Sequence, residues 1–154
     1  MMIEQELAKL GLVLPSLPKE IGVYVPYRVA GNLVFVTGRL PMLDEVLQYK
    51  GKIGKDLSVP QGTDAAKLCA QNILSVMKSA AGGDWAKIKS IVRINGAINC
   101  ESSFEDHPKV MNGASNLLVA VFGEQIGKHT RTAIGVNSLP FGAAVEVDAI
   151  FELI

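Results

Sequence analysis

The last strand-like segment of the chain constrains the fold most, because its alternating pattern requires a sheet with one buried face. In residues 145–153 (VEVDAIFEL), apolar side chains occupy every second position from Val145 to Leu153, and Glu146, Asp148 and Glu152 lie between them. Side chains alternate across a strand, so the segment presents an apolar face to a core and an acidic face away from it. A sheet covered on one side by helices satisfies this pattern.

The rest of the chain supplies the helices and strands of such a fold. Apolar residues recur at helical spacing over 68–80 and 110–122, which predicts two amphipathic helices, the first with Thr63 as its N-cap. Further β-like runs occupy 23–30, 33–37, 88–99 and 131–137, with a short strand near 46–49. The order ββ(β)αβαββ predicts an α+β fold with a mixed sheet and both helices on one face.

Length and composition limit the organisation and the partners. The 154 residues fit one domain, expected over 22–154, and 1–21 form an N-terminal extension with a short helix over 3–10. With 15 basic and 15 acidic residues, the chain has no net charge to favour nucleic acid or anionic lipid. It lacks an apolar run of about 20 residues and the regions of a signal peptide, so a soluble, cytoplasmic protein without nucleic-acid or membrane partners is expected. Cys69 and Cys100 are too few for a disulfide framework or a zinc site, and no metal is expected.

The last two strands direct attention to an arginine and a glutamate. If 131–137 and 145–153 form an antiparallel hairpin with Ile134 opposite Val147, then Arg131 and Glu146 lie on the second face of the sheet. Four residues along a strand span roughly 13 Å, so one small molecule would need such groups from two chains. The sequence leaves two interpretations of this face open, a solvated surface and a ligand site.

Four stretches resemble the Rid family of reactive-intermediate imine deaminases, also called YjgF-like proteins. They are VYVPYRVAGNLVFVTGRLP (23–41), IVRINGAI (91–98), HTRTAIGVNSLP (129–140) and AVEVDAIFEL (144–153). The resemblance implies a chorismate-mutase-like fold with ferredoxin-like strand order, and a homotrimer with sites in the clefts between subunits. It also implies hydrolysis of 2-imino acids or their enamine tautomers, such as 2-iminopropanoate or 2-iminobutanoate, to 2-keto acids and ammonia without a cofactor.

The resemblance assigns roles to particular residues. Arg131 matches the arginine that binds the substrate carboxylate, and Glu146 matches the glutamate that positions water. A guanidinium grips a carboxylate through two charge-assisted bonds, and a carboxylate can orient and deprotonate water. The expected substrate-binding residues that line the cleft are Tyr24, Thr37, Gly38 and Ala133.

The chain also departs from the family's common pattern. Ala133 stands where a cysteine is frequent and Gly135 where a glutamate is frequent, which suggests an enlarged cleft. The region 99–116 is longer than in the common pattern, so the sequence does not place the asparagine of the family's second helix on Asn112 or on Asn116.

These departures leave other functions open. A non-catalytic or regulatory protein that binds small carboxylates is the main alternative to the deaminase. A ribonuclease or translation inhibitor is the third candidate, without the basic patch that it would need. Cys100 is expected to have no local histidine to activate it, and His129 is a residue that could border the cleft.

Overall fold

The computed structural model describes residues 2–17, 19, 20 and 22–154. Met1, Pro18 and Ile21, which belong to the expected N-terminal extension, lie outside the described residues. The helical elements are α1 (Ile3–Lys9), α2 (Val59–Ala80), α3 (His107–Gly127) and the 3-10 turns η1 (Trp85–Lys87) and η2 (Pro140–Gly142). The strands are β1 (Tyr27–Ala30), β2 (Leu33–Arg39), β3 (Met42–Leu43), β4 (Val46–Leu47), β5 (Ile88–Asn99), β6 (Thr130–Val136) and β7 (Val145–Leu153).

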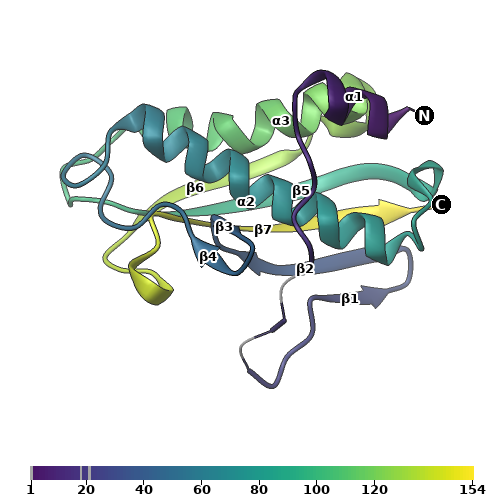
Figure 1. Cartoon of the computed structure of the whole chain (residues 1–154), viewed down its shortest axis with the longest axis horizontal. Helices are drawn as coiled ribbons and strands as arrows, with labels where there is room; N and C mark the ends of the chain where they lie inside the picture. The colour runs from purple at the N-terminus through teal and green to yellow at the C-terminus, as the bar shows by residue number, and fades with distance from the viewer. Residues whose placement is uncertain (1, 18, 21) are drawn as a thin grey trace.

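A five-stranded sheet forms one layer and the two long helices form the other (Figure 1). The strand order is β1-β2-β7-β5-β6, with only β5 and β6 parallel, and β3 and β4 form a small separate pair. Helix α2 packs on β7 and β2, and α3 packs on β5 and β6. The predicted α+β class, with a mixed sheet and both helices on one face, is therefore confirmed.

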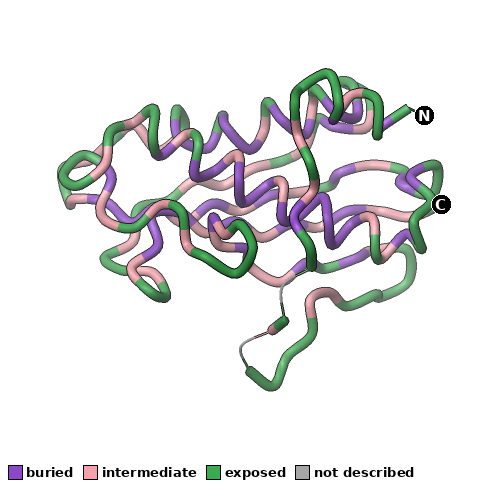
Figure 2. The backbone as a smooth tube through the Cα atoms, viewed as in Figure 1, coloured by how far each residue is buried: buried purple, intermediate pink, exposed green. Residues whose placement is uncertain are grey.

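The core lies between the helices and the sheet, where the buried segments of Figure 2 face one another. Fully buried side chains of β7, such as Val145, Val147 and Phe151, meet those of α2, such as Ile73 and Leu74. This burial is the main stabilising contribution of the alternating pattern in β7. Among the described residues, no helix is long and apolar enough to cross a membrane.

Helix α2 begins earlier than its apolar stripe predicts. Its N-cap is Ser58, whose side chain accepts from the Gln61 backbone N–H, while the Gln61 side chain accepts from the Ser58 N–H. This reciprocal capping box satisfies two amide groups at the helix start. The prediction of Thr63 as N-cap is wrong, because Thr63 lies one turn inside the helix and donates its hydroxyl to the Val59 carbonyl.

The expected hairpin between 131–137 and 145–153 is also wrong. Strand β6 pairs in parallel with β5, whereas β7 pairs antiparallel with β2 and β5 in the centre of the sheet. Since α3 connects β5 to β6, these three elements form a βαβ crossover, which brings the second strand beside the first in parallel. The loop after β6 then carries the chain past β5 to the position of β7.

This topology reverses the expected faces of β6. Arg131 lies opposite Ile94 and Gly135 opposite Ile98, and both isoleucines are fully buried beneath the helices. Arg131 and Gly135 therefore share the helix-covered face of the sheet. Ile134 lies on the other face, which none of the described helices covers, and it is 53% exposed. We call this second face the open face.

Candidate functional site

Arg131 is held at the border between edge strand β6 and helix α3. Its Nη1 donates to Asn112 Oδ1 at 2.9 Å and to Ser115 Oγ at 3.1 Å. Asn112 and Ser115 are three residues apart on α3, so they lie on the same side of that helix. Among the described residues, both hydrogen bonds of the guanidinium involve Nη1, which leaves its Nη2 and Nε donors to form a fork for a carboxylate.

The contact with Arg131 distinguishes the two candidate asparagines. Asn112 Oδ1 accepts from the guanidinium, whereas Asn116 lies one turn further along α3, and among the described residues the side-chain hydrogen bonds of Arg131 go to Asn112 and Ser115. An amide oxygen that accepts from Nη1 fixes the rotation of the guanidinium plane. The structure therefore associates Asn112, and not Asn116, with the arginine.

His129 completes a polar cluster with Ser115 and Arg131. Its Nε2 lies 3.0 Å from Ser115 Oγ, and its Nδ1 lies 2.6 Å from the Gly127 carbonyl oxygen. A carbonyl only accepts, so the hydrogen-bond network assigns the proton to Nδ1 and leaves Nε2 as the acceptor for the Ser115 hydroxyl. Burial is the main cause that lowers the pKa of His129, and the charge of Arg131 lowers it further against the opposing Gly127 hydrogen bond.

The chain turns back on itself at the end of α3, and this turn brings His129 beside Ser115 of the same helix. Gly123 has a φ of 76°, which breaks the regular helix and turns the chain. A side chain at Gly127 would place its Cβ 2.7 Å from the Leu118 carbonyl oxygen and 2.8 Å from Val119 Cα. The close return of the chain at these two glycines brings His129 back onto Ser115.

Glu146 occupies a different environment, on the open face of the sheet. Its neighbours Val145 and Val147 are fully buried under the helices, so alternation directs Glu146 to the opposite face. A Cβ on Gly38 would lie 2.6 Å from Glu146 Oε1, and the irregular register of β2 between Val36 and Arg39 contains this glycine. Burial raises the pKa of Glu146, and the charge of Asp148 raises it further.

The other residues expected around the cleft divide between the two faces. Thr37 and Gly38 lie near Glu146, and Thr37 Oγ1 donates to the Val25 carbonyl at 2.6 Å, which holds the segment that carries the exposed Tyr24. Ala133 lies with Arg131 on the helix-covered face and packs against the edge of the core.

One chain does not bring Arg131 and Glu146 together. Glu146 is opposite Ala97, which is opposite Ile134 on β6. Two strand spacings and three residues along β6 separate the two positions by roughly 14 Å, and the side chains leave opposite faces. The expectation that they share one face of a single chain is therefore wrong. A site that contains both groups needs two chains.

The N-terminal segment is anchored near the Glu146 region by an ion pair. Arg39 is 4% exposed, and its Nη2 lies 2.6 Å from Glu20 Oε1. Arg39 also donates from Nε to the Thr37 carbonyl. This buried pair attaches the residues before β1 to the irregular end of β2, beside Gly38.

The space above Gly135 is filled, contrary to the enlarged cleft that the small residue suggests. Cys100 Sγ and His107 Nε2 lie 3.6 Å apart there, so the expectation that Cys100 has no local histidine is wrong. A Cβ on Gly135 would be 2.6 Å from that nitrogen and 2.9 Å from that sulfur. Both side chains line a pocket of about 380 Å³ together with Phe104, and burial is the main cause that raises the pKa of the Cys100 thiol.

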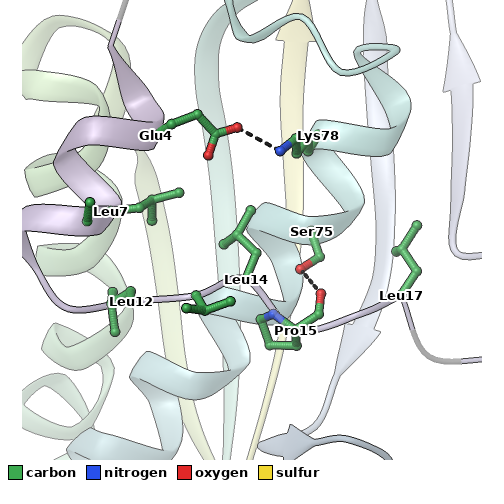
Figure 3. A pocket seen from close by; sticks show the side chains of 10 residues that line it. Glu4, Leu7, Leu12, Leu14, Pro15, Leu17, Ser75 and Lys78 are labelled. Carbon is green, nitrogen blue, oxygen red and sulfur yellow. Dashed lines mark hydrogen bonds and ion pairs between the residues drawn. The ribbon is translucent and has the colours of Figure 1, made fainter.

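A second pocket, of about 430 Å³, lies between the N-terminal segment and α2 (Figure 3). Its wall is mainly apolar, and Lys78 Nζ is paired with Glu4 Oε1 at 2.7 Å. Ser75 Oγ donates to the Pro15 carbonyl and anchors the segment across the helix. None of the expected site residues lines this pocket. Among the described residues, no group of three or more His, Cys, Asp or Glu side chains is placed to hold a metal ion.

Comparison with known proteins shows which family the chain belongs to. Residues 4–153 match the family described as "YjgF/chorismate mutase-like, putative endoribonuclease", the family that also carries the name Rid. The curated protein TCP17 of Trypanosoma cruzi is 42% identical over 151 residues, which cover 98% of this chain and 94% of TCP17.

Solved structures show the same fold. Atu1372 of Agrobacterium tumefaciens, a protein of unknown function, is 42% identical with a TM-score of 0.92, over 99% of this chain and 92% of that one. A putative endoribonuclease from Shewanella oneidensis is 33% identical with a TM-score of 0.95, over 99% and 100% of the two chains. The chain is therefore a divergent member of the family with its chorismate-mutase-like fold.

Sequence reasoning named Asn112 and His129 as open candidates and missed Ser115, which lies within hydrogen-bond distance of both Arg131 and His129. The separation of Asn112 and Ser115 on an amphipathic helix was a usable signal, since residues three apart share a face. His129 precedes Arg131 by two residues and therefore shares its side of the chain in an extended segment. Without the β5–α3–β6 crossover, however, nothing in the sequence placed α3 against this end of β6.

Proposed function

We propose that the protein hydrolyses 2-imino acids, or their enamine tautomers, to 2-keto acids and ammonia. The observation that carries this proposal is the immobilised Arg131, whose Nη1 is fixed by Asn112 and Ser115 while its other donors can form a fork for a carboxylate. Holding the substrate by its carboxylate positions the imine carbon for attack by water, and positioning supplies much of the acceleration in such a reaction.

A site that also uses Glu146 requires a second copy of the chain, and we propose the homotrimer of the family as that assembly. Phe35 and Ile134 support the proposal, because both are apolar, are more than 40% exposed and lie on the open face. Glu146 is half-buried beside Gly38, and burial raises its pKa, so its carboxyl group is held in a partly dry environment where it can hydrogen-bond a bound water molecule. In this assembly Glu146 of one subunit orients the water that attacks a substrate on Arg131 of another.

The fold has a solved example with a small carboxylate-bearing molecule. TdcF of Escherichia coli, 21% identical with a TM-score of 0.62 over 90% of this chain and 91% of TdcF, was crystallised with bound serine. Serine carries the carboxylate that an arginine fork recognises, so a ligand of this class is compatible with the fold.

Hydrolysis of 2-iminopropanoate and 2-iminobutanoate, generated in the assay, tests the proposal. Arg131→Ala removes two or more ionic hydrogen bonds to the substrate, so kcat/KM should fall about 100-fold or more. Lys128→Ala is the matched control. It also removes a positive charge, three residues before Arg131, but that charge is paired with Glu124. Both variants must retain the mass of the wild-type assembly.

The result also separates the main alternative. A wild-type protein that binds pyruvate through Arg131 and leaves the rate of imine hydrolysis unchanged would contradict the deaminase proposal. It would support a carboxylate-binding or regulatory protein with the same fold.

A further inference from the structure

The arginine half of the site contains its own proton acceptor on the same chain. Ser115 Oγ lies within hydrogen-bond distance of both Arg131 Nη1, at 3.1 Å, and His129 Nε2, at 3.0 Å. A hydroxyl has one donor and two acceptor lone pairs. With Arg131 donating to the oxygen and the hydroxyl proton directed at His129, one lone pair of Ser115 remains for a water molecule.

The imidazole is fixed in the state that can accept a proton. The Gly127 carbonyl takes the Nδ1–H at 2.6 Å, which leaves the Nε2 lone pair directed at Ser115. A second group that orients the base is a usual feature of serine–histidine pairs in enzymes. Burial lowers the pKa of His129, so the neutral, accepting form predominates near pH 7.

We propose that Ser115 and His129 accept the proton of the attacking water, with Ser115 Oγ as the relay and His129 Nε2 as the final acceptor. This inference rests on the proposed deaminase function and assigns the proton transfer within it. Glu146, on the opposite face of the same chain, then orients the water from a neighbouring subunit without taking its proton.

The proton transfers balance over the two steps of the reaction. In the first, a water O–C bond forms at the imine carbon, and the C=N π pair moves to nitrogen. The water proton passes to Ser115 as the Ser115 proton passes to His129, and the relay returns a proton to the nitrogen to give a neutral carbinolamine. In the second, the carbinolamine hydroxyl gives its proton to the relay, C=O forms, the C–N bond breaks, and nitrogen takes the proton and leaves as ammonia.

The charged groups around His129 define the expected pH dependence. On β6 the nearby charge is Arg131, which lowers the pKa of His129 in the same direction as burial. At the end of α3, Lys128 and Glu124 pair with each other at 2.9 Å. On β5, Arg93 is on the open face and donates to Thr132. The activity should therefore fall on the acid side through a pKa below the ordinary histidine value of about 6.5.

The test is a pH profile of kcat and kcat/KM above the uncatalysed rate, for wild type and four variants. His129→Gln keeps a polar side chain of similar size without a basic nitrogen, so kcat should fall about 100-fold and the acid limb should disappear. KM should change less than about threefold, since Arg131 keeps both of its hydrogen bonds. Ser115→Ala should lower kcat similarly, Ser115→Thr should restore part of it by keeping a hydroxyl, and Glu146→Gln should retain the acid limb.

Other results would overturn the inference. An acid limb that survives in His129→Gln and disappears in Glu146→Gln would make Glu146 the proton acceptor, with the deaminase function intact. Unchanged kcat in His129→Gln would show that His129 does not accept the proton and would overturn the inference as well. Absence of turnover by wild type would instead overturn the proposed function and this inference together, so the two failures are distinguishable. Long-range ¹H–¹⁵N spectra provide a check that is independent of activity, with His129 expected as the Nδ1–H tautomer at pH 7.

Discussion

The two faces of the sheet differ in how completely one chain builds its part of the site. On the helix-covered face, Arg131 donates to Asn112 and Ser115 at 2.9 and 3.1 Å, and Ser115 Oγ also lies 3.0 Å from His129 Nε2. On the open face, Glu146 lies beside Gly38 and near the like charge of Asp148, which contributes to its raised pKa.

Side chains on an edge strand next to a helix can be held in place within one chain. Side chains on an uncovered face depend instead on what packs against that face. Groups held by neighbouring side chains lose little further freedom when a ligand binds. The arginine half of the site has such neighbours within one subunit. The glutamate half has the backbone of β2 beside it and faces outward, where a second subunit can complete it.

The largest effect on the helix-covered face is expected from Gly135→Ala. The new Cβ would lie 2.6 Å from His107 Nε2 and 2.9 Å from Cys100 Sγ, so the free energy of unfolding should fall by about 1–3 kcal/mol. Urea unfolding measures this loss. In a His107→Ala background the space is vacated and the cost of Gly135→Ala should shrink. An equal cost in both backgrounds would contradict the contact.

A smaller effect is expected from the asparagine that orients Arg131. Asn112→Ala removes one hydrogen bond to a charged group, so kcat/KM should fall about tenfold for a contribution of about 1.5 kcal/mol. Asn116→Ala is the matched control on the same helix and should stay within about twofold of wild type. Equal losses in the two variants would mean that α3, and not the Asn112 contact, controls the activity.

The smallest effect concerns the stability of the open face. The pKa of Glu146 is raised in the folded protein, so the folded state holds its proton more tightly than the unfolded state does. The contribution of this group to the free energy of unfolding therefore decreases as pH rises from the ordinary glutamate value through the raised one. Glu146→Gln should remove that decrease. The free energy of unfolding of the variant minus that of wild type, measured with urea, should therefore be more favourable to the variant at pH 8 than at pH 4. If the difference in free energy of unfolding between the variant and wild type were the same at both pH values, the raised pKa of Glu146 would be contradicted.

The sequence predicted the local elements well because their signals are local. The alternation in β7 and the helical spacing in α2 and α3 identify faces that must be buried. The runs at 23–30 and 33–37 correspond to the neighbouring strands β1 and β2, which Gly31 and Asn32 connect and which pair with Ala30 opposite Leu33.

The predictions from sequence were wrong where the structure depends on contacts between residues that are distant in the sequence. The expected pairing with β7 assigned Ile134 to the core, but β6 is an edge strand whose register with β5 turns Ile134 to the open face. Its small residues leave room on the helix side for Cys100 and His107, while Ile134 is exposed on the open face. Cys100 and His107 are seven residues apart, and only the loop before α3 brings them to 3.6 Å. Pairing of β6 with β5 instead of β7 follows from the α3 crossover.

The most direct test of the central claim, that a complete site combines Arg131 of one chain with Glu146 of another, is subunit complementation. Arg131→Ala and Glu146→Gln proteins are assayed separately for imine hydrolysis, then unfolded together, refolded as a 1:1 mixture and assayed again. Each variant alone should turn over far more slowly than wild type, with Glu146→Gln keeping enough activity for its pH profile to be measured. Random assembly should restore both wild-type groups to about a quarter of the sites, and with them about a quarter of wild-type activity. Mixed assemblies of the correct mass that stay as inactive as the separate variants would contradict the claim.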